Sequence, residues 1–341
     1  MTGRSPVLIV VGGGHRVYHE YLLSLMAEHA RVWLLGDAEP TWEKLYVSGY
    51  TVVDTGDAAA VAEAATRLAE RATVDGVSCL DGAGSVACAH AAAALGLPAT
   101  EPEVVARSHK QDEVHDVSAD DLTFDIACVD GEPYPLFVSR RIDAVLPELT
   151  GSGYIVDSTF ADEETTAVAM AAQRSAGVRY GVTHTRVTRT ARGPKVVSVH
   201  WGLSGDLVPY AASIADGVNP GRVLVQVALG LRPDPIPARA HRVAAVGFLT
   251  AQPDTAIGPV HADETRLPLS VDVAEAFPAP DRRSLRYAYS VVVDDTVAGC
   301  ARALAAAEKA FMPRPKGKSR DGATGVPDAP VLPDASAGPV R

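Results

Sequence analysis

Residues 181–206, GVTHTRVTRTARGPKVVSVHWGLSGD, decide the fold of this chain. Two runs rich in Val and Thr flank a turn containing Gly-Pro, a pattern typical of a β-hairpin. Alternate residues of a strand share one face. Pairing the runs about Arg192 therefore predicts a polar face that carries His184, Arg186, Thr188, Ser198 and His200, with His184 opposite His200 and Arg186 opposite Ser198. The other face is apolar and predicted to be core: Val187, Val197, Val199 and Trp201.

Composition bounds the classes of function. The chain has 341 residues, 47% of them hydrophobic, which is enough for a sizeable core in two or three domains. Its net charge of −11 disfavours nucleic acid as a ligand. The sequence has no apolar run of about 18 residues, so we expect no contact with a membrane and a cytoplasmic location. The widely spaced cysteines are predicted to be free thiols: Cys79, Cys88, Cys128 and Cys300.

Strands and helices alternate over residues 1–110, which predicts a doubly wound parallel α/β domain. Apolar runs predict its strands at 6–11, 31–35, 50–53 and 77–80. Helical patterns follow: one to Glu28, then 57–73 and a third ending near Gly96.

Residues 111–312 change character and predict an α+β domain. A hairpin is expected at 122–141 around Asp130-Gly131, and further elements are predicted as helices at 162–177, 207–230 and 295–311 and strands at 242–251 and 285–294. Residues 313–341 are rich in Pro, Gly, Asp and Ala, and predict a disordered tail.

Three further stretches accompany the hairpin: ALGLPATEPEVVARSHKQDEV (94–114), FDIACVDGEPYPLFVSRR (124–141) and RYAYSVVVDDTVAGCARALAAAEKAF (286–311). In this order the four stretches resemble the ATP-grasp superfamily, especially its carboxylate–amine ligases and carboxylases. Lys110 falls on a lysine of that family. The likeness covers most of residues 6–311 and implies an ATP-grasp-like C-terminal domain.

The departures from this resemblance concern ATP. The family holds Mg²⁺ with two acidic residues and an Asn on the hairpin, and here Arg186 and Ser198 stand at the acids and His200 at the Asn. Gly202 stands at a following Arg. Mg²⁺ prefers oxygen ligands, and Arg is a permanent cation. The family also inserts a lid subdomain where residues 111–121 alone span the gap, so the lid is expected to be truncated. We therefore predict no cofactor and no metal.

The hairpin side chains have competing interpretations. His184 and His200 are predicted as a catalytic acid/base pair, because imidazole titrates near neutrality. They could instead satisfy backbone groups in an emptied pocket, or join a transition-metal site with Asp206 or His241 as third ligand. Arg186 could anchor an anion in a catalytic role or form a salt bridge that holds the floor together.

Substrate-binding candidates lie on three segments. Ser198 shares the hairpin face, and Asp206 matches an Asp that the family places at the start of a helix facing substrate, although Asp is also a common helix N-cap. His15 and Arg16 follow Gly12-Gly13-Gly14, which serves either as a tight turn or as part of the substrate pocket.

Three functions remain open. The first is a repurposed, ATP-independent enzyme acting on an anionic amino-acid-like or peptide-like metabolite of bacterial specialised metabolism. The second is a non-catalytic partner of a genuine ligase. The third is an ATP-dependent ligase with atypical metal ligation, which alone would use ATP and Mg²⁺. The expected partners are a small anionic molecule and either a second copy, forming a homodimer, or a ligase.

Overall fold

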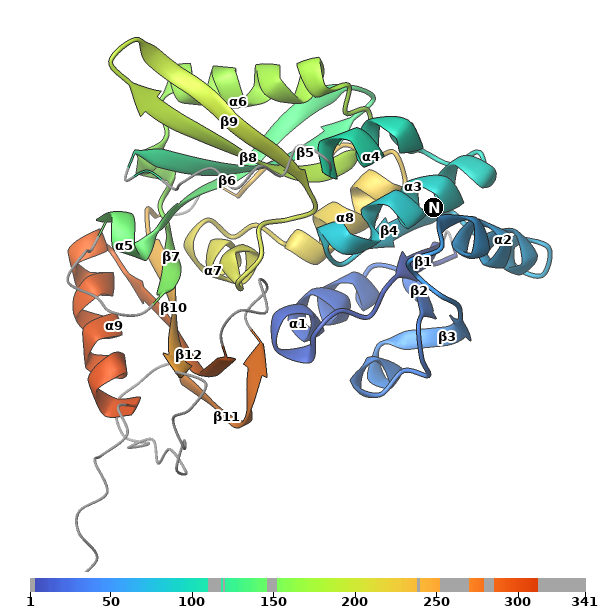
Figure 1. The fold of residues 1–341 in the computed structure, drawn as a ribbon, viewed down its shortest axis with the longest axis horizontal. Helices are drawn as coiled ribbons and strands as arrows, with labels where there is room; N and C mark the ends of the chain where they lie inside the picture. Colours follow the sequence, from blue (N-terminus) through green and yellow to red (C-terminus); the bar gives the residue numbers. More distant parts are fainter. Residues whose placement is uncertain are drawn as a thin grey trace, which may run out of the picture.

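The structure is a computed structural model that describes residues 4–109, 118, 120–145, 152–237, 240–251, 270–278 and 285–311. It contains two β-sheets, each covered by helices (Figure 1). The mixed α/β architecture confirms the predicted fold class. The predicted disordered tail and Lys110 lie outside the described residues.

The first sheet is parallel, with the order β3-β2-β1-β4. Its strands are β1 (Val7–Val11), β2 (Arg31–Gly36), β3 (Val47–Val52) and β4 (Gly76–Cys79). The helices of this half are α1 (Arg16–Ala27), α2 (Ala58–Ala69), α3 (Ser85–Ala94) and α4 (Pro102–His109), with short 3₁₀ turns at Trp42–Leu45 and Gly82–Gly84. One core cluster packs α2 and α3 on one face and another packs α1 on the other, so the sheet is doubly wound.

The second sheet has eight strands in the order β11-β12-β10-β7-β6-β5-β8-β9, with antiparallel neighbours. The strands are β5 (Asp121–Val129), β6 (Glu132–Arg141), β7 (Ser152–Val156), β8 (Gly181–Thr190), β9 (Gly193–Trp201), β10 (Val243–Ala251), β11 (Ser270–Pro278) and β12 (Leu285–Asp294). Residues 110–120 connect α4 directly to this sheet.

Helices flank this sheet: α5 (Ile142–Val145), α6 (Glu163–Ala176), α7 (Val208–Ala215), α8 (Pro220–Ala228) and α9 (Val297–Phe311), with a 3₁₀ turn at Ser158–Phe160. Helix α6 covers β5, β6, β8 and β9, and α9 packs on β10 and β12 (Figure 1). A capping box between Asp162 and Thr165 begins α6, and left-handed Gly177 ends it.

The structure differs from the sequence-based prediction at three elements. The single helix predicted at 207–230 is two helices, because Gly217 is left-handed and Asn219 caps a new helix by accepting from the Arg222 amide. Strands β7 and β11 were not predicted at all.

The two sheets share a core. Leu8 and Val10 of β1 and Met26 of α1 lie in one buried cluster with Val223 and Val227 of α8, which packs along α1. The segment following the hairpin therefore ties the second sheet to the first. Within the described part of the chain, no helix combines the length and apolar character needed to cross a bilayer.

Candidate functional site

The β8–β9 hairpin has the register predicted for its polar residues. His184 pairs with His200, and Arg186 pairs with Ser198. A bulge follows Arg186, and Val187 pairs with Val196 instead of Val197. The predicted register is therefore wrong by one residue between this bulge and the turn.

Helix α6 fixes which face of β8 looks outward. The Gln173 side chain is fully buried, accepts a hydrogen bond from the Thr183 hydroxyl at 2.7 Å, and donates one to the Thr185 hydroxyl. Thr183 and Thr185 are also fully buried. Because side chains alternate along a strand, this contact directs His184 and Arg186 to the opposite face of the sheet.

Four predicted side chains meet in one cavity on that opposite face, which we call the floor pocket. Its volume is about 180 Å³, and it is lined by His184, Arg186, Ser198 and His200. Tyr154, which the sequence offered as either a pocket residue or core, also lines it. Sequence reasoning had not placed other lining residues there, among them Asp121, Thr123, Arg141 and Ser204. Thr188, predicted on the same face, does not line the pocket.

The two histidines of the floor pocket stack. Their ring centroids lie 5.0 Å apart with an interplanar angle of 20°. His184 Nδ1 lies 3.1 Å from the Gly202 carbonyl oxygen. A carbonyl accepts, so this contact assigns the proton to Nδ1 and leaves Nε2 as the acceptor nitrogen in neutral His184.

Two arginines face the floor pocket, each beside a carboxylate. The Arg186 Nε lies 3.7 Å from Asp121 Oδ2, and both side chains are largely buried. Arg141 pairs with Asp143, with both groups partly exposed. Tyr154 faces the pocket too, and burial raises its pKa to about 12, so its hydroxyl stays a donor at neutral pH.

Asp125 is a buried carboxylate that sequence reasoning missed. It lies opposite His184 on the neighbouring strand. Its two oxygens accept from the Ser204 amide at 2.6 Å and the Ser204 hydroxyl at 2.5 Å. Burial raises its pKa to about 7, although the Ser204 bonds act in the other direction. Asp125 thus holds the loop after β9 against the floor; the available signal was a single Asp within an apolar strand.

Asp206 lies close by but is already engaged. Its carboxylate pairs with Arg286, whose guanidinium also donates to the Tyr18 hydroxyl at 2.9 Å and lies 3.9 Å from the Phe248 ring centroid. The N-cap of α7 is Leu207, so the alternative reading of Asp206 as that cap is wrong. Both residues have left-handed φ, 57° and 59°, which side chains rarely adopt.

The remaining candidates lie outside the lining of the floor pocket. His15 is the N-cap of α1, its ring centroid lies 5.6 Å from that of Tyr18 with the rings tilted by 53°, and burial lowers its pKa. Arg16 pairs with Glu20 at 2.9 Å and is largely exposed. His241 lines a different cavity, so it is not brought to the histidine pair. Among the described residues, no group of three His, Cys, Asp or Glu side chains could hold a metal ion.

Gly202, in the loop after β9, lies against the backbone of Asp81 and Gly82, just after β4. It has φ +88°, and a Cβ there would lie 2.9 Å from the Gly82 amide nitrogen. A side chain at either glycine would push the loop after β9 away from the end of β4. The Gly that stands at the family's Arg therefore has a steric reason.

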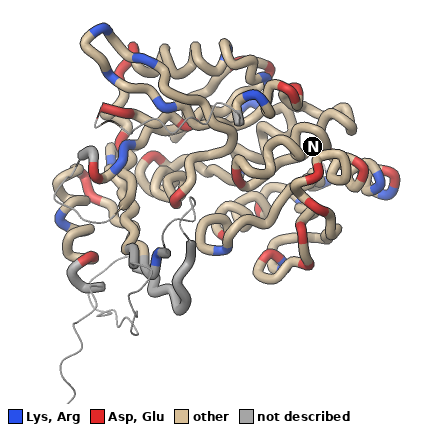
Figure 2. The backbone as a smooth tube through the Cα atoms, viewed as in Figure 1, with Lys and Arg blue, Asp and Glu red and all other residues tan. Residues whose placement is uncertain are grey.

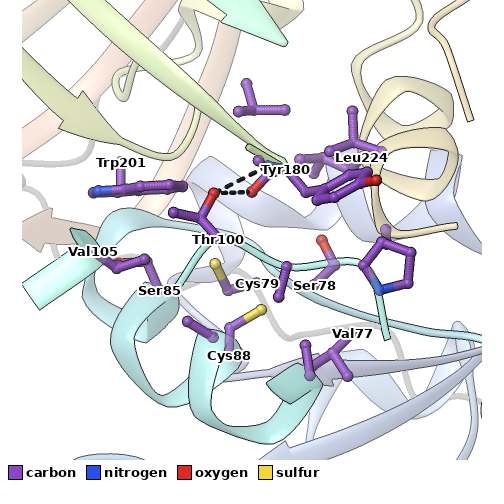
Figure 3. Close-up of a pocket in the computed structure, with 18 of the residues that line it drawn as sticks. Val77, Ser78, Cys79, Ser85, Cys88, Thr100, Val105, Tyr180, Trp201 and Leu224 are labelled. Carbon is purple, nitrogen blue, oxygen red and sulfur yellow. Dashed lines mark hydrogen bonds between the residues drawn. The ribbon is translucent and has the colours of Figure 1, made fainter. Parts of the chain in front are cut away.

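A smaller, apolar cavity of about 80 Å³ lies beside this junction (Figure 3). The Cys79 and Cys88 thiols lie next to each other there, and the hydrogen bond between them, with burial, raises the pKa of Cys79. All four cysteines are free, as predicted. The lining of the cavity is mostly apolar core, including Val77, Ala92 and Val227, so we regard it as a packing void.

Charges differ between the two halves of the described chain. Figure 2 shows Lys and Arg following the β8–β9 hairpin, where Arg186, Arg189, Arg192 and Lys195 lie. The floor pocket itself contains two guanidinium groups and one carboxylate. These cations are partly balanced, since Arg186 lies beside Asp121 and Arg189 pairs with Asp162.

Comparison with known proteins identifies the fold of this chain. No protein-family profile matches the sequence. No curated protein matches it either. The structure is similar to the L-amino acid ligase from Bacillus licheniformis (15% identity, TM-score 0.65, 89% of this chain and 98% of that chain). It is also similar to phosphoribosylglycinamide synthetase from Anaerococcus prevotii (7% identity, TM-score 0.63, 88% of this chain and 97% of that chain). A third similar structure is N5-carboxyaminoimidazole ribonucleotide synthetase from Thermotoga maritima (12% identity, TM-score 0.56, 89% of this chain and 98% of that chain). At such identities the likeness establishes architecture, and the chain has the ATP-grasp fold.

Proposed function

We propose that this chain is a repurposed enzyme that works without ATP on an anionic amino-acid-like or peptide-like metabolite of bacterial specialised metabolism. The observation that carries the proposal is the meeting of His184, Arg186, Ser198 and His200 in one cavity of about 180 Å³. The cavity lies on the strands that the ATP-grasp fold uses as its floor, with ligases among its structural neighbours.

The charges of the floor pocket favour an anion. Arg186 and Arg141 are balanced within the lining by Asp121 alone. Asp121 Oδ2 lies 3.7 Å from Arg186 Nε and orients the guanidinium, a group that binds carboxylates in a bidentate geometry. Ser198 Oγ is buried without a hydrogen-bond partner among the described residues, and a ligand oxygen would supply one.

The histidine pair supplies proton transfer. Two stacked imidazolium rings repel each other, so the pair favours one charged ring and one neutral ring. One ring then acts as acid while His184 Nε2 acts as base, and the Gly202 carbonyl holds the base in its tautomer.

The floor does not fit Mg²⁺. Where the resemblance implies two acids and an Asn, the pocket presents Arg186, Ser198 and His200. A guanidinium repels the metal, and imidazole suits softer ions. The short link at residues 110–120 agrees with a truncated lid. We therefore derive no step through ATP or Mg²⁺.

The Arg186–Asp121 ion pair favours a second candidate, a non-catalytic partner of a ligase whose floor is closed by charge pairing. The two candidates differ in whether the pocket takes ligand. In the first, Asp121 orients Arg186 for an incoming anion. In the second, it neutralises Arg186 permanently.

A thermal-shift experiment separates these functions. The full chain is titrated with ATP and Mg²⁺, and with a panel of amino acids, dipeptides and inorganic phosphate. Bound ligand raises the melting temperature by linkage. We expect stabilisation by an anion that Arg186→Gln abolishes and Arg189→Gln keeps, because Arg189 pairs with Asp162 on the exposed edge of the hairpin.

Stabilisation by ATP with Mg²⁺ would refute the ATP-independent reading. No anion response at all would favour the non-catalytic partner. Once a substrate is found, His184→Ala and His200→Ala should each abolish turnover while leaving anion binding intact. Wild-type rates in both variants would refute the acid/base role. Roles for Asp206, His15 and Arg16 in binding substrate stay part of this proposal.

A further inference from the structure

A second, larger cavity lies at the edge of β6. Strand β7 pairs with β6 from Ser139 onward, and among the described residues no strand pairs with that edge before Ser139. The cavity beside it has a volume of about 450 Å³, within the range of small-molecule pockets. It shares no lining residue with the floor pocket.

Most of the lining is apolar. The aromatic rings of Phe124 and Phe137, the side chain of Val138, and Ile236 with Pro237 surround it. Ile236 is 42% exposed, which is unusual for a large aliphatic side chain in a cavity wall. These walls suit a flat or branched hydrocarbon group.

One corner of the cavity is ionisable. Asp216 and His241 line it, and Asp157 lies beside His241 without lining the cavity. Asp157 is buried and accepts from the Thr159 amide at 2.8 Å and the Thr159 hydroxyl at 2.7 Å. His241 Nε2 lies 3.6 Å from the same oxygen. Asp216, at the end of α7, completes the corner, and its Oδ2 is buried without a hydrogen-bond partner among the described residues.

The Asp216 carboxyl is mostly ionised at neutral pH, because its pKa stays below 7. Burial and the nearby Asp157 raise the pKa of Asp216 to about 6, while His241 acts in the opposite direction. Cys300 of α9 also lies near Asp157, but burial raises its pKa to about 12, so it contributes no charge. A buried, ionised carboxylate oxygen without a partner is costly, and a ligand cation would offset that cost.

We propose that this cavity binds a primary amine with an apolar body, a ligand class distinct from the anion of the floor pocket. The ammonium group pairs with Asp216, the carboxylate of the lining. The hydrocarbon body lies against Phe124, Phe137 and Ile236. Anionic ligands are repelled by Asp216, and neutral ones leave its oxygen unpaired.

Calorimetric titration of the full chain with three probes of equal size tests this proposal: 2-phenylethylamine, 2-phenylethanol and phenylacetate. At pH 7.5 we expect the amine to bind about tenfold more tightly than the alcohol, the equivalent of one charge-assisted hydrogen bond. Phenylacetate should not bind. Amine affinity should fall below pH 6, where Asp216 is protonated.

Two variants locate the interaction. Asp216→Asn should remove the preference for the amine while retaining the melting temperature, since it removes a buried charge. Asp143→Asn, at an exposed carboxylate elsewhere, should bind like the wild type. Arg186→Gln should also bind the amine normally, so this test is independent of the proposed function. Equal binding of amine and alcohol, or an unchanged preference in Asp216→Asn, would overturn the proposal.

Discussion

The buried carboxylate of Asp125 makes a prediction about pH and stability. Its pKa rises from 3.8 to about 7 on folding, because burial disfavours its charge. The folded protein therefore holds this proton more tightly than the unfolded chain. Stability falls as pH rises from about 4 to 7, where the unfolded carboxyl is ionised and the folded one is losing its proton.

The magnitude follows from the same values. Each pH unit across this interval is worth roughly 1.4 kcal/mol, so the ionised Asp125 costs the folded state about 4 kcal/mol by pH 7.5. Asp125→Asn removes the titration and keeps an oxygen for the Ser204 amide. We expect the free energy of unfolding of the variant, minus that of the wild type, to increase by about 4 kcal/mol between pH 4 and pH 7.5.

Urea unfolding followed by circular dichroism at half-unit pH steps measures this difference. Subtracting the two curves cancels every group that titrates equally in both proteins. Asp295→Asn, at an exposed position just before α9, is the matched control and should track the wild type at all pH values. If the curves of Asp125→Asn and wild type run parallel, the carboxylate is not held in a desolvated state and the reasoning fails.

Three further predictions concern close contacts between different elements of the fold. Arg286→Met should lower the free energy of unfolding by about 3–5 kcal/mol in urea titrations, since it leaves the buried Asp206 unpaired, and adding Asp206→Asn should restore most of the loss. Gly202→Ala should lower the melting temperature far more than Gly96→Ala, because both have positive φ but only the added Cβ at position 202 collides with backbone. Gln173→Leu should cost about 2–4 kcal/mol of unfolding free energy by stranding two buried hydroxyls of β8; a loss below about 0.5 kcal/mol would contradict the bonding described.

The sequence predicted the hairpin because its signal is local. Alternating Val and Thr around a Gly-Pro turn sets both the strands and their faces, and the pairs through Arg186 and Ser198 are confirmed. The bulge at Val197 was not predictable, because V-V-S-V offers apolar residues to the core in either register. The break after α7 could have been predicted, since Gly217 and Asn219-Pro220 are ordinary stop and start signals.

The chemistry of the two cavities was less accessible from sequence. Asp125 reaches Ser204 across 79 positions of the chain, and no short-range pattern records that bond. Asp157, Asp216 and His241 come from three separate loops and meet because β7, α7 and β10 converge. Hydrophobic periodicity in the sequence predicts helices, strands and their buried faces, whereas these contacts depend on how elements distant in the sequence pack together.

The two faces of β8 have different parts, one in the fold and one in the proposed function. On the back face, Thr183 and Thr185 are locked to Gln173 of α6, and this contact fixes the register whatever the front face carries. The side chains at positions 184, 186, 198 and 200 line the floor pocket on the opposite face. A shared architecture at 7–15% identity therefore does not fix the chemistry of that pocket. The anion and ATP titrations test this directly, because Arg186→Gln changes the front face, whereas Arg189→Gln removes a charge that lies outside the floor pocket and pairs with Asp162.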